Sequence, residues 1–218
     1  MHLQRYIRTW LHAGLVLLLA GMATLAHAES DPRQVVSDAV ERMTSRIEAE
    51  REALKADPDK AKALVREELA DLVDFKRITR MVMGDYFGPS SKEQKYRFLD
   101  VFKNSLINTY ASGITLYDGQ KIETLPMQDG DRKGDYARVR MEVKTNSGQV
   151  VPIYYTLFLR DDQWKVINVY VNGLDLRDTF QSQFAQGMQQ YNDIDKVIDN
   201  WSADAKIDAG IEGEDQKG

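Results

Sequence analysis

The sequence contains no cysteine, which excludes disulfides and thiol catalysis. Its three histidines, His2, His12 and His27, all precede residue 28. A chain that loses this stretch cannot form a Ser-His-Asp or Cys-His apparatus, and it could build a zinc site only from carboxylates. The sequence also has no GxxxxGK[ST] motif and no GxGxxG motif after a strand, so a nucleotide site has no local support. Catalysis would have to use carboxylate, lysine, tyrosine or hydroxyl groups, whereas binding functions stay open.

A strong positive charge is also missing. The 218 residues include 29 basic and 34 acidic side chains, and the pI is near 5.3. This balance argues against an electrostatic grip on nucleic acid phosphates. The hydrophobic share of 43% and the charged share of 29% fit one globular domain with a substantial core.

The N-terminus has the composition of a secretory signal peptide. Arg5 and Arg8 precede an apolar run at residues 13–25, and residues 26–28 (Ala-His-Ala) form a small-x-small cleavage site. We predict cleavage after residue 28, because the run is short for a membrane span and Glu29 follows at once. The mature chain would then carry 27 basic and 34 acidic side chains, a net charge of −7.

Apolar spacing in steps of three and four predicts helices in the first half of the chain. Asp57 can cap the second of them, and a proline follows it at the first helical position. A capping box, either Ser90 with Glu93 or Ser91 with Gln94, can open the fourth. The predicted helices cover residues 31–55, 58–73, 75–83 and 91–112.

After residue 119 the apolar period changes from helical to two, which predicts strands. The predicted strands cover residues 120–127, 137–143, 151–159 and 164–171. Asp175 and Asp193 can then cap two more helices. We therefore predict an α+β domain at residues 29–203, with a curved antiparallel sheet of about four strands and helices packed on one face. Residues 204–218 are acidic and rich in glycine, and we expect a flexible tail.

The acidic segment around Asp129, Asp131 and Asp135 is a poor calcium loop. Lys133 stands at a ligand position, and Arg140 stands where the bidentate glutamate should be. A solvated turn is the simpler interpretation. We expect no metal site and no cofactor.

Four stretches resemble the MlaC or toluene-tolerance family of periplasmic phospholipid-binding proteins. They are residues 57–69 (DPDKAKALVREEL), 73–87 (VDFKRITRMVMGDYF), 110–120 (YASGITLYDGQ) and 164–184 (WKVINVYVNGLDLRDTFQSQF). The similarity covers nearly all of residues 31–203 in the same order and spacing. None of these stretches is a catalytic signature, so the specificity of the resemblance lies in their combination.

The resemblance implies a fold like that of nuclear transport factor two, with acyl chains held between the helices and the sheet. It implies a periplasmic carrier that shuttles phospholipids between the outer and inner membranes, maintains outer-membrane lipid asymmetry and is not an enzyme. The implied partners are an outer-membrane lipoprotein-porin complex and an inner-membrane ABC transporter with an MCE-domain ring. We expect a monomer, with phospholipid as cargo rather than as cofactor.

Apolar and tyrosine side chains on the predicted helices and strands are the candidates for a lipid pocket, although each could be ordinary core. The hypothesis names Ile78, Met81, Val82, Phe87, Phe102, Leu106, Tyr110, Tyr117, Val139, Met141, Tyr155, Leu157, Val169 and Val171. Four arginines are candidates for contact with phosphate head groups or with acidic groups of a partner, although solvated charge is the simpler interpretation: Arg77, Arg80, Arg138 and Arg140.

Two alternatives remain open at this point. Related α+β folds include isomerases that use a pocket aspartate and tyrosine, and Asp85 with Tyr86, or Asp118 with Tyr117, could form such a pair. A peptide-binding periplasmic chaperone is the other alternative, and it predicts that protein rather than lipid copurifies.

Overall fold

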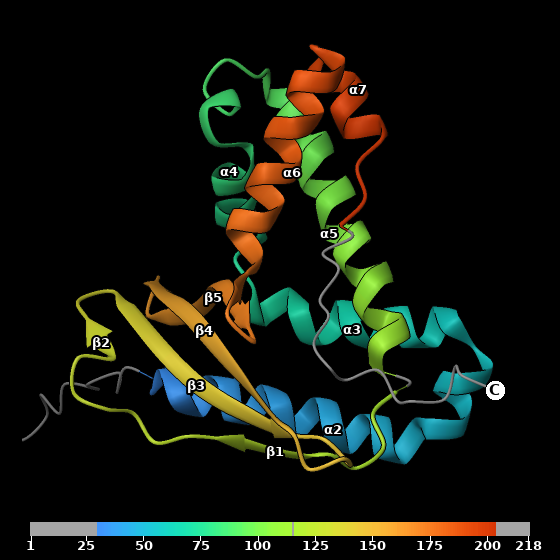
Figure 1. The fold of residues 1–218 in the computed structure, drawn as a ribbon, viewed down its shortest axis with the longest axis vertical. Helices are drawn as coiled ribbons and strands as arrows, with labels where there is room; N and C mark the ends of the chain where they lie inside the picture. The colour runs from blue at the N-terminus through green and yellow to red at the C-terminus, as the bar shows by residue number, and fades with distance from the viewer. Residues whose placement is uncertain (1–29, 115, 204–218) are drawn as a thin grey trace, which may run out of the picture.

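Figure 1 shows the computed structural model, which describes residues 30–114 and 116–203. The predicted signal peptide at residues 1–28 and the predicted tail at 204–218 lie outside the described residues. Within the described ranges the chain is α+β, as predicted, and the long helices and strands fall within a few residues of their predicted bounds.

The first two helices are α2 (Pro32–Ala56) and α3 (Pro58–Leu72), which pack against each other. Each begins with an aspartate cap followed by proline, a combination that satisfies free backbone N–H groups and fixes the first turn. The Asp31 carboxylate accepts a hydrogen bond from the Arg33 backbone N–H at 2.9 Å. Asp57 accepts from the backbone N–H of Asp59 at 3.0 Å. The predicted cap at Asp57 is confirmed.

The next two helices are α4 (Phe75–Met83), followed by the 3-10 turn η1 (Gly84–Tyr86), and α5 (Lys92–Ile114). Gly84 ends α4 with a φ of 52°, a conformation that side chains other than glycine rarely adopt. Of the two predicted capping boxes, the structure contains the second. The Ser91 hydroxyl accepts from the Gln94 N–H at 3.1 Å, and the Gln94 side chain accepts from the Ser91 N–H at 3.0 Å.

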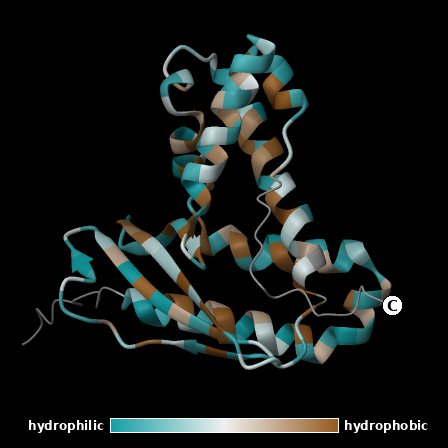
Figure 2. Cartoon of the chain, in the orientation of Figure 1, coloured by the Kyte–Doolittle hydropathy of each residue, from teal (hydrophilic) through white to brown (hydrophobic). Residues whose placement is uncertain are grey.

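The sheet is antiparallel, in the order β1-β3-β4-β5-β6, with β2 paired to β3. Its four longer strands are those predicted from the alternation, and two strands of two residues each were not predicted. Hydrophobic and hydrophilic residues alternate along β3 (Figure 2). The strands are β1 (Lys121–Thr124), β2 (Arg132–Lys133), β3 (Tyr136–Lys144), β4 (Val150–Arg160), β5 (Gln163–Val171) and β6 (Leu174–Asp175).

A β-bulge interrupts the pairing of β4 with β5. Leu157 pairs with Val166 and Thr156 pairs with Asn168, so Ile167 is the extra residue. Because of this shift, Val166 and Val169 both pair with residues on the inner face of β4. The bulge brings the buried side chain of Asn168 to the start of the helix that follows the sheet.

The last two helices are α6 (Leu176–Tyr191) and α7 (Ile194–Asp199). With α4 and the first half of α5 they form a bundle that extends away from the sheet, while α2 and α3 lie along the sheet (Figure 1). Helices α2 and α3 lie on the sheet as predicted. The separate bundle that extends beyond the sheet was not predicted. Helix α5 runs from this bundle to the α2 and α3 layer (Figure 1).

An aromatic cluster holds the bundle together. Phe98 is fully buried, and its ring lies 4.8 Å from that of Phe184 and 5.0 Å from that of Trp201, both edge-on. Trp201 also contacts the rings of Phe102 and Phe180. Such aromatic pairs stabilise a core beyond their buried area. Trp201 therefore ties the segment after α7 to both α5 and α6.

We predict that Trp201→Ala lowers the free energy of unfolding by about 3 kcal/mol, the usual cost of truncating a packed aromatic side chain. Trp201→Phe should cost far less, because it keeps the ring contacts and removes an indole N–H that has no hydrogen-bond partner among the described residues. Urea denaturation of both variants tests this. Equal losses for alanine and phenylalanine would contradict the role given to the ring.

Candidate functional site

An apolar cavity of about 370 Å³ lies between the helices and the inner face of the sheet. This volume falls within the range of small-molecule pockets. Its wall combines side chains from α2 to α6 with those of β4 and β5. The lining residues are Met43, Val65, Leu69, Val73, Phe75, Ile78, Phe102, Leu106, Tyr110, Ile114, Ile153, Tyr155, Val166, Ile167, Asn168, Val169, Val171, Leu176, Arg177 and Phe180.

Few polar groups line this cavity, and no carboxylate is among its described lining residues. Asn168 is occupied by the protein itself. Its Oδ1 accepts from the backbone N–H of Val169 at 2.8 Å and of Arg177 at 3.2 Å, while its Nδ2 donates to Asp175 Oδ1 at 2.9 Å. The Arg177 guanidinium is held by Asp178 at 2.7 Å. These polar side chains bind other groups of the protein at the edge of the cavity. The remaining wall is therefore apolar.

Asp175 caps α6 beside this network, accepting from the Asp178 N–H at 3.0 Å. Burial alone would raise the pKa of Asp175. Hydrogen bonds from Asp178, Asn168 and Tyr170, together with the Arg177 charge, lower it below its usual value. The charged carboxylate therefore fixes the junction between β5 and α6.

Two tyrosines place phenol groups at the cavity. The Tyr155 hydroxyl has one weak contact, to Met141 Sδ at 3.9 Å. Burial raises the pKa of Tyr110 to about 12, and burial together with the nearby Tyr110 raises the pKa of Tyr155 further. Both phenols are therefore neutral at physiological pH.

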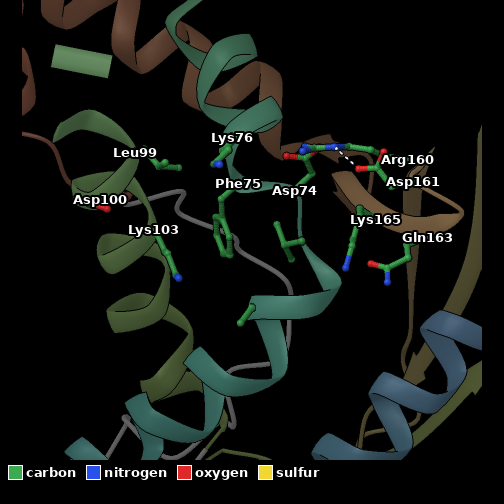
Figure 3. A pocket seen from close by; sticks show the side chains of 12 residues that line it. Asp74, Phe75, Lys76, Leu99, Asp100, Lys103, Arg160, Asp161, Gln163 and Lys165 are labelled. Carbon is green, nitrogen blue, oxygen red and sulfur yellow. Dashed lines mark hydrogen bonds and ion pairs between the residues drawn. The ribbon is translucent and has the colours of Figure 1, made fainter. Parts of the chain in front are cut away.

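A second pocket, of about 400 Å³, adjoins the first at Val73 and Phe75 but has a charged rim (Figure 3). Arg160 lies 3.3 Å from Asp74 and 3.3 Å from Asp161, and Lys165 donates to the Asp71 carbonyl. Because charged side chains make up much of its lining, the second pocket suits an apolar ligand less well than the first.

The structure brings seven of the fourteen predicted pocket residues together at the apolar cavity. They come from α4, α5, β4 and β5, and they are Ile78, Phe102, Leu106, Tyr110, Tyr155, Val169 and Val171. Their contact with lipid stays a prediction.

The other seven lie elsewhere. Four are core side chains with little or no exposure: Val82, Val139, Met141 and Leu157. Met81 packs against the main core from a partly buried position. Phe87 lines a separate groove between α4 and α5, and Tyr117 donates a hydrogen bond to Glu48 Oε1 at 3.2 Å.

Sequence reasoning missed the lining residues that come from α2, α3 and α6. Met43, Val65 and Leu69 belong to helical stripes that the periodicity did identify, so a search along every stripe would have included them. Asn168 and Ile167 carried no signal, because the bulge that positions them does not alter the apolar composition of β5.

The two aspartate-tyrosine pairs lie outside the cavity wall. Asp118 is exposed and bound to Arg51 at 2.7 Å, while Tyr117 is turned to Glu48. Asp85 lies in η1, where its neighbour Tyr86 packs near Phe184, with ring centroids 5.9 Å apart. Neither arrangement places a carboxylate against an apolar ligand in the cavity.

The four arginines considered for head-group contact are also not among the described lining residues of the cavity. Arg77 stacks on Phe158 at 3.5 Å from the ring centre, and Arg80 lies over Phe87 at 5.6 Å. Arg140 pairs with Asp131 at 3.2 Å, and Arg138 is exposed on β3. None of the helices at residues 30–114 or 116–203 is both long enough and apolar enough to cross a membrane.

Comparison with known proteins gives a consistent set of relatives. A profile of the family described as MlaC protein matches residues 37–203. Toluene tolerance protein ttg2D of Pseudomonas putida is 35% identical over 196 residues, which cover 89% of this chain and 90% of that protein. The intermembrane phospholipid transport system binding protein MlaC of Haemophilus influenzae is 25% identical over 198 residues, covering 88% and 91%.

Solved structures are also similar, and one of them is that of the phospholipid-binding protein from Ralstonia solanacearum in complex with a phospholipid. The TM-score is 0.72 and the sequence identity is 26%, with coverage of 78% of this chain and 94% of that one.

The buried phenol of Tyr110 predicts a loss of stability in alkali. The group ionises near pH 10 in an unfolded chain and near pH 12 in the folded protein, so its contribution is complete below pH 10 and disappears as the pH rises through 12. We expect the free energy of unfolding to fall over this interval by about 2 kcal/mol more in the wild type than in Tyr110→Phe.

Urea denaturation across this pH interval measures the difference. Tyr96→Phe, at a tyrosine that is 53% exposed, is the matched control and should follow the wild type. Superimposable profiles for wild type and Tyr110→Phe would show that the phenol is not buried as described.

Proposed function

The chain belongs to the MlaC family, and on that premise we propose that it is a periplasmic phospholipid carrier that holds acyl chains in the apolar cavity. The observation that carries the proposal is the cavity wall. It consists almost entirely of apolar and aromatic side chains, and its polar groups are largely bound within the protein. The phospholipid in the Ralstonia solanacearum protein supports the same assignment by similarity.

The thermodynamics of lipid transfer require such a wall. Two acyl chains with about 30 methylenes would gain on the order of 25 kcal/mol on leaving water, at ~0.8 kcal/mol per methylene. This exceeds the roughly 20 kcal/mol at which noncovalent affinities saturate. The lipid must therefore pass between a bilayer and a pocket of comparable apolarity, where the net free energy of exchange lies near zero. Handover in either direction then needs no chemical step.

The lining residues support carriage rather than catalysis. The described wall has no carboxylate, and its two phenols are kept neutral by burial, so it lacks a charged base to start proton transfer. The aspartates considered for an isomerase are placed elsewhere, with Asp118 bound to Arg51. We therefore propose that the protein is not an enzyme.

The carrier proposal also includes the path that the lipid takes between the two membranes. The signal peptide predicted at residues 1–28 fits a periplasmic protein. We propose that the protein acts as a monomer between an outer-membrane lipoprotein-porin complex and an inner-membrane ABC transporter with an MCE-domain ring, and that this transfer maintains outer-membrane lipid asymmetry. The name of the Haemophilus influenzae relative, which refers to an intermembrane phospholipid transport system, supports this route.

We predict that Val169→Glu abolishes bound lipid, because it places a charge in the apolar wall opposite Tyr155. Val150→Glu is the matched control, since Val150 is 49% exposed at the start of β4 and does not line the cavity. Native mass spectrometry of the purified proteins, followed by organic extraction, measures the cargo. Wild type and Val150→Glu should each carry stoichiometric phospholipid.

Val169→Phe provides a second test that adds no charge. It narrows the cavity with an apolar ring, so it should reduce the amount of lipid held even if Val169→Glu fails to fold. A folded Val169→Glu protein with the full lipid complement would exclude this cavity as the site. A wild-type protein that is free of lipid and takes none from vesicles would contradict the carrier proposal itself.

A further inference from the structure

A groove of about 340 Å³ lies between α4, the turn after η1 and the first turns of α5. Three lysines line it, Lys76, Lys92 and Lys95, together with the rings of Phe87 and Tyr96. Its described lining contains no carboxylate. The groove is therefore positive, although the mature chain as a whole is predicted to carry a net charge of −7.

No ion pair within the described residues neutralises the lysines of this groove, although Lys76 also lines the charged pocket together with Asp74 and Asp100 (Figure 3). None of the three forms an ion pair with a described residue, whereas Arg46 and Arg97 each contact two or more carboxylates. Two of the lysines lie near aromatic rings. Lys95 Nζ is 4.6 Å from the centre of the Phe87 ring, and Lys92 Nζ is 5.9 Å from that of Tyr96. The rings place the ammonium groups without cancelling their charge.

Thr79, in the wall of the groove, carries a hydroxyl without a partner among the described residues. Thr79 is only 3% exposed, and its hydroxyl makes no hydrogen bond to any described residue. A buried hydroxyl in this state lowers stability unless something binds it. An oxygen acceptor that enters the groove between the lysines would satisfy it.

Helix α4 presents the groove and the cavity on different faces. Ile78 lines the cavity, while Lys76 and Thr79 line the groove. Helix α5 is divided in the same way, with Phe102 in the cavity and Leu99 in the groove. A ligand in the groove would therefore lie one helical layer away from the cavity.

We propose that this groove docks the protein on a bilayer surface by binding the phosphate of an anionic phospholipid. Lysine binds phosphate as a point charge and needs no fixed orientation of the head group, whereas arginine binds carboxylates and phosphates in a bidentate geometry. Tyr96 is 53% exposed beside the lysines, and tyrosine favours the level of the head groups at a membrane surface. This surface is additional to the cargo cavity and does not depend on what the cavity holds.

The test uses the mature protein and two kinds of vesicle, one of phosphatidylcholine alone and one that also contains phosphatidylglycerol. The wild type should sediment with the second kind only. Each lysine near an anionic surface contributes about fivefold to affinity. The triple variant Lys76→Gln, Lys92→Gln, Lys95→Gln should therefore bind about 100-fold more weakly.

The matched control removes three positive charges elsewhere: Lys55→Gln, Lys60→Gln and Lys144→Gln. These lysines are exposed and form no ion pair with a described residue. The control should lose much less affinity than the groove variant. Equal losses, or a wild type that binds both kinds of vesicle alike, would overturn the proposal.

Thr79→Val distinguishes a phosphate that binds inside the groove from general electrostatic attraction between the lysines and the vesicle surface. It should weaken binding to anionic vesicles about fivefold, the value of one hydrogen bond, without lowering the melting temperature. Unchanged binding would show that nothing enters the groove and would overturn the proposal.

Native mass spectrometry of the triple variant distinguishes this docking surface from the cargo site. The variant should keep the same cargo as the wild type. Loss of cargo would assign the lysines to the head group of the carried lipid instead. In a separate binding assay, a triple variant that still binds vesicles but no longer binds an acidic protein would assign the lysines to a protein partner. Both results would contradict docking on a bilayer.

Discussion

The structure depends on a single constraint, which is that α5 must be held at a distance from the inner face of β4 and β5. Both ends of the helix are fixed. Phe98 is locked into the aromatic cluster with Phe184 and Trp201, and Ile107 and Ala111 are buried against α2 and α3. Between and beside these anchors, the face that carries Phe102, Leu106 and Tyr110 turns to the cavity. Packing at the two ends thus keeps open a space that hydrophobic collapse would otherwise close.

A cavity of this kind exchanges an apolar ligand only if its wall has few free hydrogen-bonding groups that would hold water. Two backbone N–H groups beside the cavity would otherwise need a hydrogen-bond acceptor. The bulge at Ile167 brings Asn168 to the first turn of α6, where its side chain accepts from both of them. Asp175 and Arg177 are bound in the same region. The phenols of Tyr110 and Tyr155 stay neutral because burial raises their pKa values. The proposed cargo would therefore leave a bilayer for surroundings of similar polarity, which is the condition for reversible transfer.

The elements were predictable because local chemistry defines them. The cap at Asp57, the proline after it and the alternation along β3 each have one good structural solution, whereas the sequence allowed two capping boxes and the structure contains the one at Ser91. The cavity was predictable only in part, because a side chain that lines a cavity and one that fills the core obey the same period. Val139 and Leu157 proved to be fully buried core, whereas Val169 and Val171 line the space. The bulge and the separate helical bundle depend on tertiary packing, and no local pattern in the sequence indicates them.

The central claim is that acyl chains occupy the cavity beneath α5. A crystal structure of the protein loaded with a phospholipid that carries bromine on its acyl chains tests this directly, because anomalous scattering locates the bromine atoms. The account predicts bromine peaks among Phe102, Tyr155 and Val169, with the head group outside the apolar wall. Ordered bromine peaks in the charged pocket beside Arg160, or only on the outer surface, would contradict it.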